Sequence, residues 1–199
     1  MILDAKAFYA TKTGRLLPYR MRLGEIEVSS IISDYSKVKS LCQNGCRMFG
    51  SGACPPNSPK FDAFKHKYSH FVLGVIDIKP EEWLTAKQQN KPFLAVSVMQ
   101  KLGAVVEDVM CKKMKDLTAH KNKRLLQSGY CNECTMCAAK VSSGVCAHPD
   151  KCHFSMEATG ILVEPTIVNA LFEPLQWIDY KSKELPSTIK RVVLYCAGD

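Results

Sequence analysis

The chain has 199 residues, 46% of them hydrophobic, and a formal net charge of +8. This length and composition suit a soluble globular domain with its own core. They exclude a membrane-spanning protein, because the longest apolar stretches, 71–78 and 93–99, are broken by glycine or polar residues long before a spanning length of about 18 to 20 residues is reached.

Ten cysteines could indicate a secreted disulfide scaffold, but such scaffolds are usually much shorter. Residues 1–20 also contain no apolar run that could serve as a signal peptide. We therefore expect a cytoplasmic protein in which the cysteines stay reduced and act as metal ligands.

The basic excess is a weak indication of nucleic-acid binding, since the formal charge counts every cysteine as neutral. A four-iron cluster with four thiolates carries about −2, so two clusters would lower the balance to roughly +4. The densest basic patch has no interleaved aromatic residues, which argues against base stacking. We expect a solvated helix face or a docking surface for an acidic redox partner protein. The patch comprises Lys112, Lys113, Lys115, Lys121, Lys123 and Arg124.

The first third of the chain predicts a short strand and a helix. Residues 25–28 alternate in polarity and could form a strand. Ser33 is a candidate N-cap for a helix whose apolar positions include Tyr35 and Val38, and this helix would place Cys42 in its last turn.

The middle of the chain predicts two helices and a strand. Residues 58–67 can form a short helix, and 71–78 is the clearest strand. A long helix is expected from Pro92 to about Thr118, with 93–98 as a possible strand instead. Core packing is the expected role of the four sulfur-containing residues in this helix, which are Met99, Met110, Cys111 and Met114.

After the cysteine-rich loop, residues 155–160 predict a short helix ended by Gly160, and 161–163 a strand. A helix over 166–175 and a terminal strand over 191–196 follow. The expected fold is a single α+β or α/β metal-binding domain over 1–199. It would have a small central sheet, flanking helices and two cysteine-rich loops, at 42–56 and 129–153.

The loop at 129–153 carries the strongest chemical signal. Cys131, Cys134 and Cys137 are separated by two residues each, and Cys146 follows. This spacing suits an iron–sulfur cluster, in which a turn can direct three thiolates into one concave surface. Zinc is the alternative, although tetrahedral zinc usually takes two separate Cys-x2-Cys pairs and would leave the middle thiol unused.

A second cysteine group consists of Cys42, Cys46 and Cys54. Three glycines, Gly45, Gly50 and Gly52, would let the backbone wrap closely around a bound ion or cluster. The prolines after Cys54 restrict the direction in which the chain leaves this residue. Three buried cysteines beside a Gly/Pro turn would produce the same pattern, because free cysteine packs well as a small hydrophobe.

The second group has only three local thiols. Cys152 is the expected extra ligand, since Cys111 on a helix and Cys196 on a terminal strand would face the core. Alternatively, Cys54 could complete the Cys131 trio. Both versions predict that the two cysteine-rich regions lie side by side.

Several motifs in the same order resemble an uncharacterised family of predicted metal-binding proteins, found largely in anaerobic bacteria and archaea. The resemblance covers roughly 38–165. It implies a metal or iron–sulfur site on seven cysteines, which are Cys42, Cys46, Cys54, Cys131, Cys134, Cys137 and Cys146. The motifs are Phe49-Gly50 before Cys54-Pro-Pro, the Cys-x2-Cys-x2-Cys run, Cys146-x-His-Pro and Ser-Met-Glu-Ala-x-Gly-Ile. The chain departs from the family at Gly52-Ala53, where an aromatic residue is usual, and at Cys152, where a basic or polar residue is common.

Three functions follow from these patterns. The first is an iron–sulfur redox protein that exchanges electrons with a protein partner. The second is an enzyme whose centre on Cys42, Cys46 and Cys54 leaves one iron open as a Lewis acid or sulfur-transfer site. The third is a zinc-stabilised binding module. His148 and Glu157 are expected to be structural near the cluster, while His153 remains a possible ligand.

Overall fold

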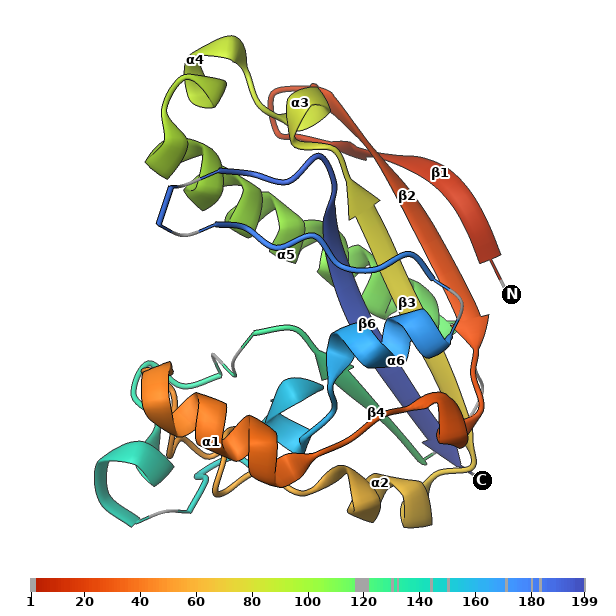
Figure 1. Ribbon diagram of the computed structural model, residues 1–199, viewed down its shortest axis with the longest axis vertical. Helices are drawn as coiled ribbons and strands as arrows, with labels where there is room; N and C mark the ends of the chain where they lie inside the picture. The colour runs from red at the N-terminus through yellow and green to blue at the C-terminus, as the bar shows by residue number, and fades with distance from the viewer. Residues whose placement is uncertain are drawn as a thin grey trace. The chain divides into compact units, whose positions relative to one another are not determined.

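Figure 1 shows the computed structural model, which describes residues 3–116, 122–129, 131, 133–143, 145–149, 151–170, 172–179, 181–182 and 184–198. Six strands form one mixed sheet in the order β1-β2-β3-β6-β4-β5, accompanied by helices, so the α+β class is confirmed. The chain divides into two compact units. The first comprises Met1–Glu25, Leu73–Ala119 and Pro174–Val192, and the second Ile26–Val72, His120–Glu173 and Val193–Asp199.

The first unit is built on an antiparallel hairpin and a long helix. Strands β1 (Leu3–Ala10) and β2 (Leu16–Glu25) pair with Leu3 opposite Leu23. The unit also contains most of β3 (His70–Ile78), the start of β6 (Ile189–Gly198), and helices α3 (Pro80–Trp83), α4 (Ala86–Gln89) and α5 (Pro92–Asp116). Helix α5 packs closely on β3 at Gly74. A β-carbon added to Gly74 would lie only 2.8 Å from the sulfur of Met110, so the absence of a side chain allows this approach. Met99, Met110, Cys111 and Met114 are all buried, as expected.

The second unit contains nine of the ten cysteines, all except Cys111. Strand β4 pairs with β5 in parallel and with β6 antiparallel. Phe61, Phe64 and Phe71 form part of its core, with Phe61 and Phe71 in edge-to-face contact. Its elements are η1 (Val28–Ser30), α1 (Tyr35–Gly45), α2 (Phe61–Lys67), β4 (Asn122–Gln127), η2 (Ala139–Ser143), β5 (Phe154–Ser155), η3 (Glu157–Thr159) and α6 (Val163–Asn169).

Several predicted elements are confirmed. Cys42 lies in the last turn of α1, strand β3 covers 71–78, and α2 forms within 58–67. Helix α5 begins at Pro92, so a strand over 93–98 is wrong; the expected end at Thr118 falls outside the described residues. The terminal strand is β6. No helix within the described ranges is long and apolar enough to cross a membrane.

Two predictions in the first third of the chain are wrong. Residues 25–28 do not form a strand, because β2 ends at Glu25 and Val28 begins a 3-10 turn. The N-cap of α1 is Asp34 and not Ser33, since the Asp34 carboxylate accepts a hydrogen bond from the backbone N–H of Lys37.

The region after the cysteine-rich loop also differs from expectation. Ile161 makes an isolated bridge with Ser33, and Val163 begins α6, which ends at Asn169 and does not extend to Leu175. Within 155–160, a 3-10 turn replaces the expected helix, although Gly160 ends it in the left-handed conformation with φ of +93°. The β1–β2 hairpin and β4 were not predicted from the sequence.

Candidate metal centre

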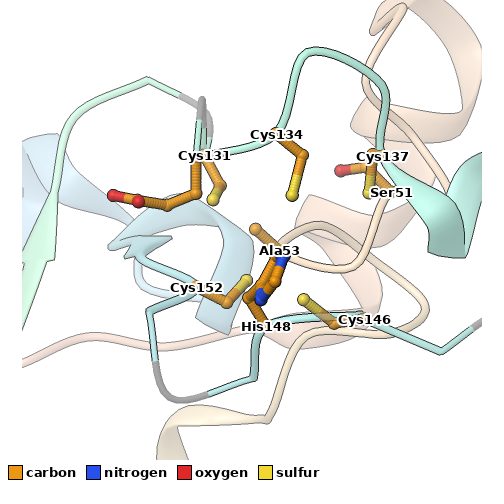
Figure 2. Close-up of a pocket in the computed structure, with 9 residues that line it drawn as sticks. Ser51, Ala53, Cys131, Cys134, Cys137, Cys146, His148 and Cys152 are labelled. Atoms are coloured by element: carbon orange, nitrogen blue, oxygen red, sulfur yellow. The ribbon is translucent and has the colours of Figure 1, made fainter.

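Five cysteines of the second unit line one hollow, which we call the thiol pocket. Cys131, Cys134 and Cys137 come from one segment, and Cys146 and Cys152 return from further along the chain. Figure 2 shows their sulfur atoms around a common space, with Ala53 between the two groups. The remaining lining residues are Ser51, Glu133 and His148.

The segment that carries Cys131 to Cys137 is held by turns at both ends. Gly129 has a φ of +83°, a conformation that glycine adopts without steric cost. At the other end, the backbone N–H groups of Lys140 and Val141 donate to the carbonyl oxygen of Cys137 at 3.0 and 3.2 Å. Cys137 is therefore anchored to the start of η2, and its thiol has a defined position at the pocket wall.

The segment after α1 folds into successive tight turns. The N–H of Cys54 donates to the carbonyl oxygen of Ser51 at 3.1 Å, and the Asn57 side-chain amide donates to the carbonyl oxygen of Gly50 at 2.9 Å. Gly50 has a φ of +83°, which favours glycine at this turn. These turns present Ser51 and Ala53 to the thiol pocket.

The two cysteine-rich segments lie side by side, as the sequence predicted. The backbone N–H of Gly52 donates a hydrogen bond to the sulfur of Cys137 at 3.3 Å, although the two residues are 85 positions apart. The Lys140 ammonium group also donates to the carbonyl oxygen of Arg47. Of the three glycines expected to allow close wrapping, Gly52 makes this approach.

The thiols of the pocket differ in acidity. The N–H of Gly52 is the main cause that lowers the pKa of Cys137, because a thiolate accepts this bond more strongly than a thiol. Loss of water contact raises the pKa of Cys134, helped by the nearby Cys146. Burial raises the pKa of Cys152 to about 12, and the neighbouring thiols of Cys131 and Cys146 add to the effect.

Cys42, Cys46 and Cys54 form a second group of neighbouring thiols. Burial raises the pKa of Cys42, and the negative charges of Cys46, Cys54 and Glu157 add to the effect. Burial also raises the pKa of Cys54, against the opposing hydrogen bond from the Ser51 hydroxyl. Negative charge on Cys137 also raises the pKa of Cys54, so the two thiol groups are near neighbours.

The three candidates for an extra ligand have different positions. Cys152 lines the thiol pocket together with Cys131 and Cys146. Cys111 is buried in α5 of the first unit, and Cys196 is fully buried in β6. Burial raises the pKa of Cys196, which suits a packing residue.

Some lining residues were not found by sequence reasoning. Ser51 and Glu133 have no distinctive spacing, and only their closeness in sequence to Cys54 and Cys134 could have indicated them, whereas Ala53 was noted only as a departure from the family. His148 lines the pocket, and its carbonyl oxygen accepts the N–H of Cys152 at 2.9 Å, which agrees with a structural role. His153, the other candidate histidine, is not among the residues that line the pocket.

The donor set fits a thiolate-bound metal group. Among the residues that the structure describes, no three Cys, His, Asp or Glu side chains already stand in the arrangement that holds a single ion. Five thiols nevertheless line one hollow. Thiolates are the ligands that iron–sulfur clusters and structural zinc prefer.

Comparison with known proteins agrees with this donor set. Residues 24–194 match the model of a family described as predicted metal-binding protein (DUF2284). No curated protein and no solved structure matches the chain.

Proposed function

The chain belongs to the DUF2284 family of predicted metal-binding proteins, and from that premise we propose that it binds a four-iron iron–sulfur cluster and transfers electrons to or from a protein partner. The ligands would be Cys131, Cys134, Cys137 and Cys146. The observation that carries this proposal is the convergence of their sulfur atoms, from two stretches of chain, on one hollow (Figure 2). None of the ten cysteines, all of which lie in the described part of the chain, forms a disulfide, and this suits the reducing cytoplasm.

The spacing of the thiols favours a cluster over zinc. Three evenly spaced thiols all line the pocket, so the middle thiol, Cys134, is not surplus as it would be in a two-pair zinc site. A cluster bound there would supply one-electron transfer.

The chain's own residues would hold and shield the centre. The thiolates bind it, and the N–H of Gly52 orients the sulfur of Cys137. Ala53 is 2% exposed and places its methyl group at the pocket wall, where it limits access of water. Hydrogen bonding and solvent exclusion of this kind both tune a cluster's reduction potential.

A partner protein would dock on exposed apolar side chains that are close in sequence to the cysteines. Four large apolar residues of the second unit are strongly exposed, each within four positions of a cysteine of one of the two thiol groups, and we call them the apolar rim. Its members are Leu41, Met136, Val141 and Val145. Large contiguous patches of exposed apolar residues mark interaction sites, and methionine is enriched in interfaces. The net charge of +8 favours an acidic partner.

A second candidate function is supported by the position of Cys152. Its thiol lines the pocket with Cys131 and Cys146, a position that favours a group of Cys42, Cys46 and Cys54 without a fourth thiolate. A metal bound by these three thiolates would keep a position open to substrate, which is the arrangement of a Lewis-acid enzyme.

Anaerobic purification followed by iron, sulfide and zinc analysis tests these proposals. We expect brown protein with iron and sulfide in equal amounts and about four of each per chain for one cluster. Additional iron that is lost in a Cys42→Ser/Cys46→Ser double variant would support the open centre. Colourless protein that holds stoichiometric zinc would overturn the iron–sulfur proposal and leave the zinc module.

A further inference from the structure

The turn over Ser51–Cys54 contains a glycine that touches the thiol pocket from outside the ligand loop. We propose that Gly52 is a positioning residue that sets the reduction potential of the centre, because its backbone N–H holds the sulfur of Cys137 and its lack of a side chain allows that approach. This inference rests on the proposed function.

The hydrogen bond acts directly on a ligand sulfur. The N–H of Gly52 lies 3.3 Å from the sulfur of Cys137, within the range of a bond to sulfur. Such a donor stabilises negative charge on the sulfur, and a reduced centre carries one more negative charge than an oxidised one. The bond therefore favours the reduced state and raises the reduction potential.

The space around Gly52 is closed on the side where a side chain would stand. A β-carbon at this position would lie 3.0 Å from the β-carbon of Cys146 and 3.3 Å from that of Ala139. Both neighbours are β-carbons fixed to their own backbones, so neither can swing aside as a long side chain could. A methyl group would push the turn away from the pocket.

Backbone conformation does not explain the glycine at position 52, because its φ is not in the left-handed region. Two nearby glycines differ in an instructive way. Gly45, at the end of α1, has an ordinary φ and open space, with no atom within 4 Å of the point that a β-carbon would occupy. Gly50 has equally open space but a φ of +83°. Gly50→Ala would therefore strain the same turn without touching a ligand.

These differences provide matched variants. Gly52→Ala, Gly50→Ala and Gly45→Ala are purified anaerobically, and each is titrated for reduction potential, iron retention against a chelator and melting temperature. We expect Gly52→Ala to shift the potential to more negative values and to lower metal affinity about 10- to 100-fold. Gly50→Ala should lower the melting temperature and keep the wild-type potential. Gly45→Ala should match the wild type in all three.

Equal potentials for Gly52→Ala and wild-type protein, with iron present in both, would overturn the inference and leave the proposed function standing. An equal shift in Gly50→Ala would overturn it too, since the effect would then follow loss of stability. Wild-type protein without iron would overturn the proposed function and the inference with it.

Wild-type protein provides a measurement that does not depend on a folded Gly52→Ala variant. In protein labelled with ¹⁵N-glycine, pulsed EPR of the reduced centre should detect hyperfine coupling to a glycine nitrogen, with an exchangeable proton in D₂O. Absence of a glycine coupling from the reduced centre would contradict the hydrogen bond.

Discussion

The hydroxyl group of Ser58 donates a hydrogen bond to the carbonyl oxygen of Ala158 at 2.5 Å, and both residues are buried. Ser58 follows the first cysteine group by four residues, and Ala158 lies in the turn that follows Cys152. This bond therefore joins the stretches of chain that directly follow the two cysteine-rich loops. Together with the Gly52–Cys137 contact, it ties together segments that are far apart in the chain.

Ser58→Ala should destabilise the protein by about 1–3 kcal/mol, because the buried carbonyl oxygen of Ala158 would lose its partner. The free energy of unfolding, measured by urea denaturation, checks this value. Ser40→Ala is the control: Ser40 is exposed on α1, and its replacement should change the stability by less than about 0.5 kcal/mol. Equal stabilities for the two variants would contradict the role of the Ser58 bond.

Gly160→Ala should be more destabilising than Gly14→Ala. Both glycines have positive φ, +93° and +80°, so each substitution carries the same kind of backbone penalty of about 1 kcal/mol. A β-carbon on Gly160 would also lie 2.7 Å from the α-carbon of Tyr35, while Gly14 has nothing within 4 Å. Overpacking adds about 1–3 kcal/mol at position 160 alone.

Thermal unfolding of the Gly160→Ala and Gly14→Ala variants measures the difference. A clear gap in melting temperature is expected, with Gly160→Ala the lower. If the two melting temperatures coincide, the close approach of Gly160 to α1 is not a constraint on stability.

The Cys134→Ala variant should bind far less metal than the Cys196→Ala variant. Loss of a thiolate removes metal-binding free energy that is also folding free energy. Cys196 is fully buried in β6, and its removal should cost only about 1 kcal/mol of packing. Metal content by elemental analysis and melting temperature are measured on both variants. Full metal content in Cys134→Ala protein would count against the ligand assignment.

Cys152 should act as a reserve ligand for the cluster. Its thiol lines the same pocket as Cys131 and Cys146, so it can replace either when a four-iron centre takes four of five thiols. We expect Cys152→Ser to keep its iron and Cys131→Ser to keep much of it, while the Cys131→Ser/Cys152→Ser double variant loses it.

Iron per chain and visible absorbance measure this non-additivity. A Cys131→Ser variant as poor in iron as the double variant would show that Cys152 does not substitute. Cys111→Ser, in the first unit, is the control and should have wild-type iron content.

Local sequence patterns were sufficient for several elements. The apolar spacing after Pro92 predicted α5, and the apolar run ended by Lys79-Pro80 predicted β3, because both signals depend on neighbouring residues in the chain. The Cys131, Cys134 and Cys137 spacing likewise indicated a shared concave surface. The hairpin β1–β2 was missed, since β1 alternates only between half-buried and exposed positions.

Only the tertiary structure decided which thiols share a pocket. Sequence spacing favoured Cys152 as an extra ligand of the Cys42 group, and the return of the chain after Cys146 places its thiol in the pocket with Cys131. Sequence also treated Gly45, Gly50 and Gly52 alike, whereas the approach of the Cys146 segment singles out Gly52. These relationships depend on contacts between residues about 85 to 100 positions apart, which no local pattern encodes. The cysteine spacing and the helix periodicity, in contrast, involve only neighbouring residues and can be read from the sequence itself.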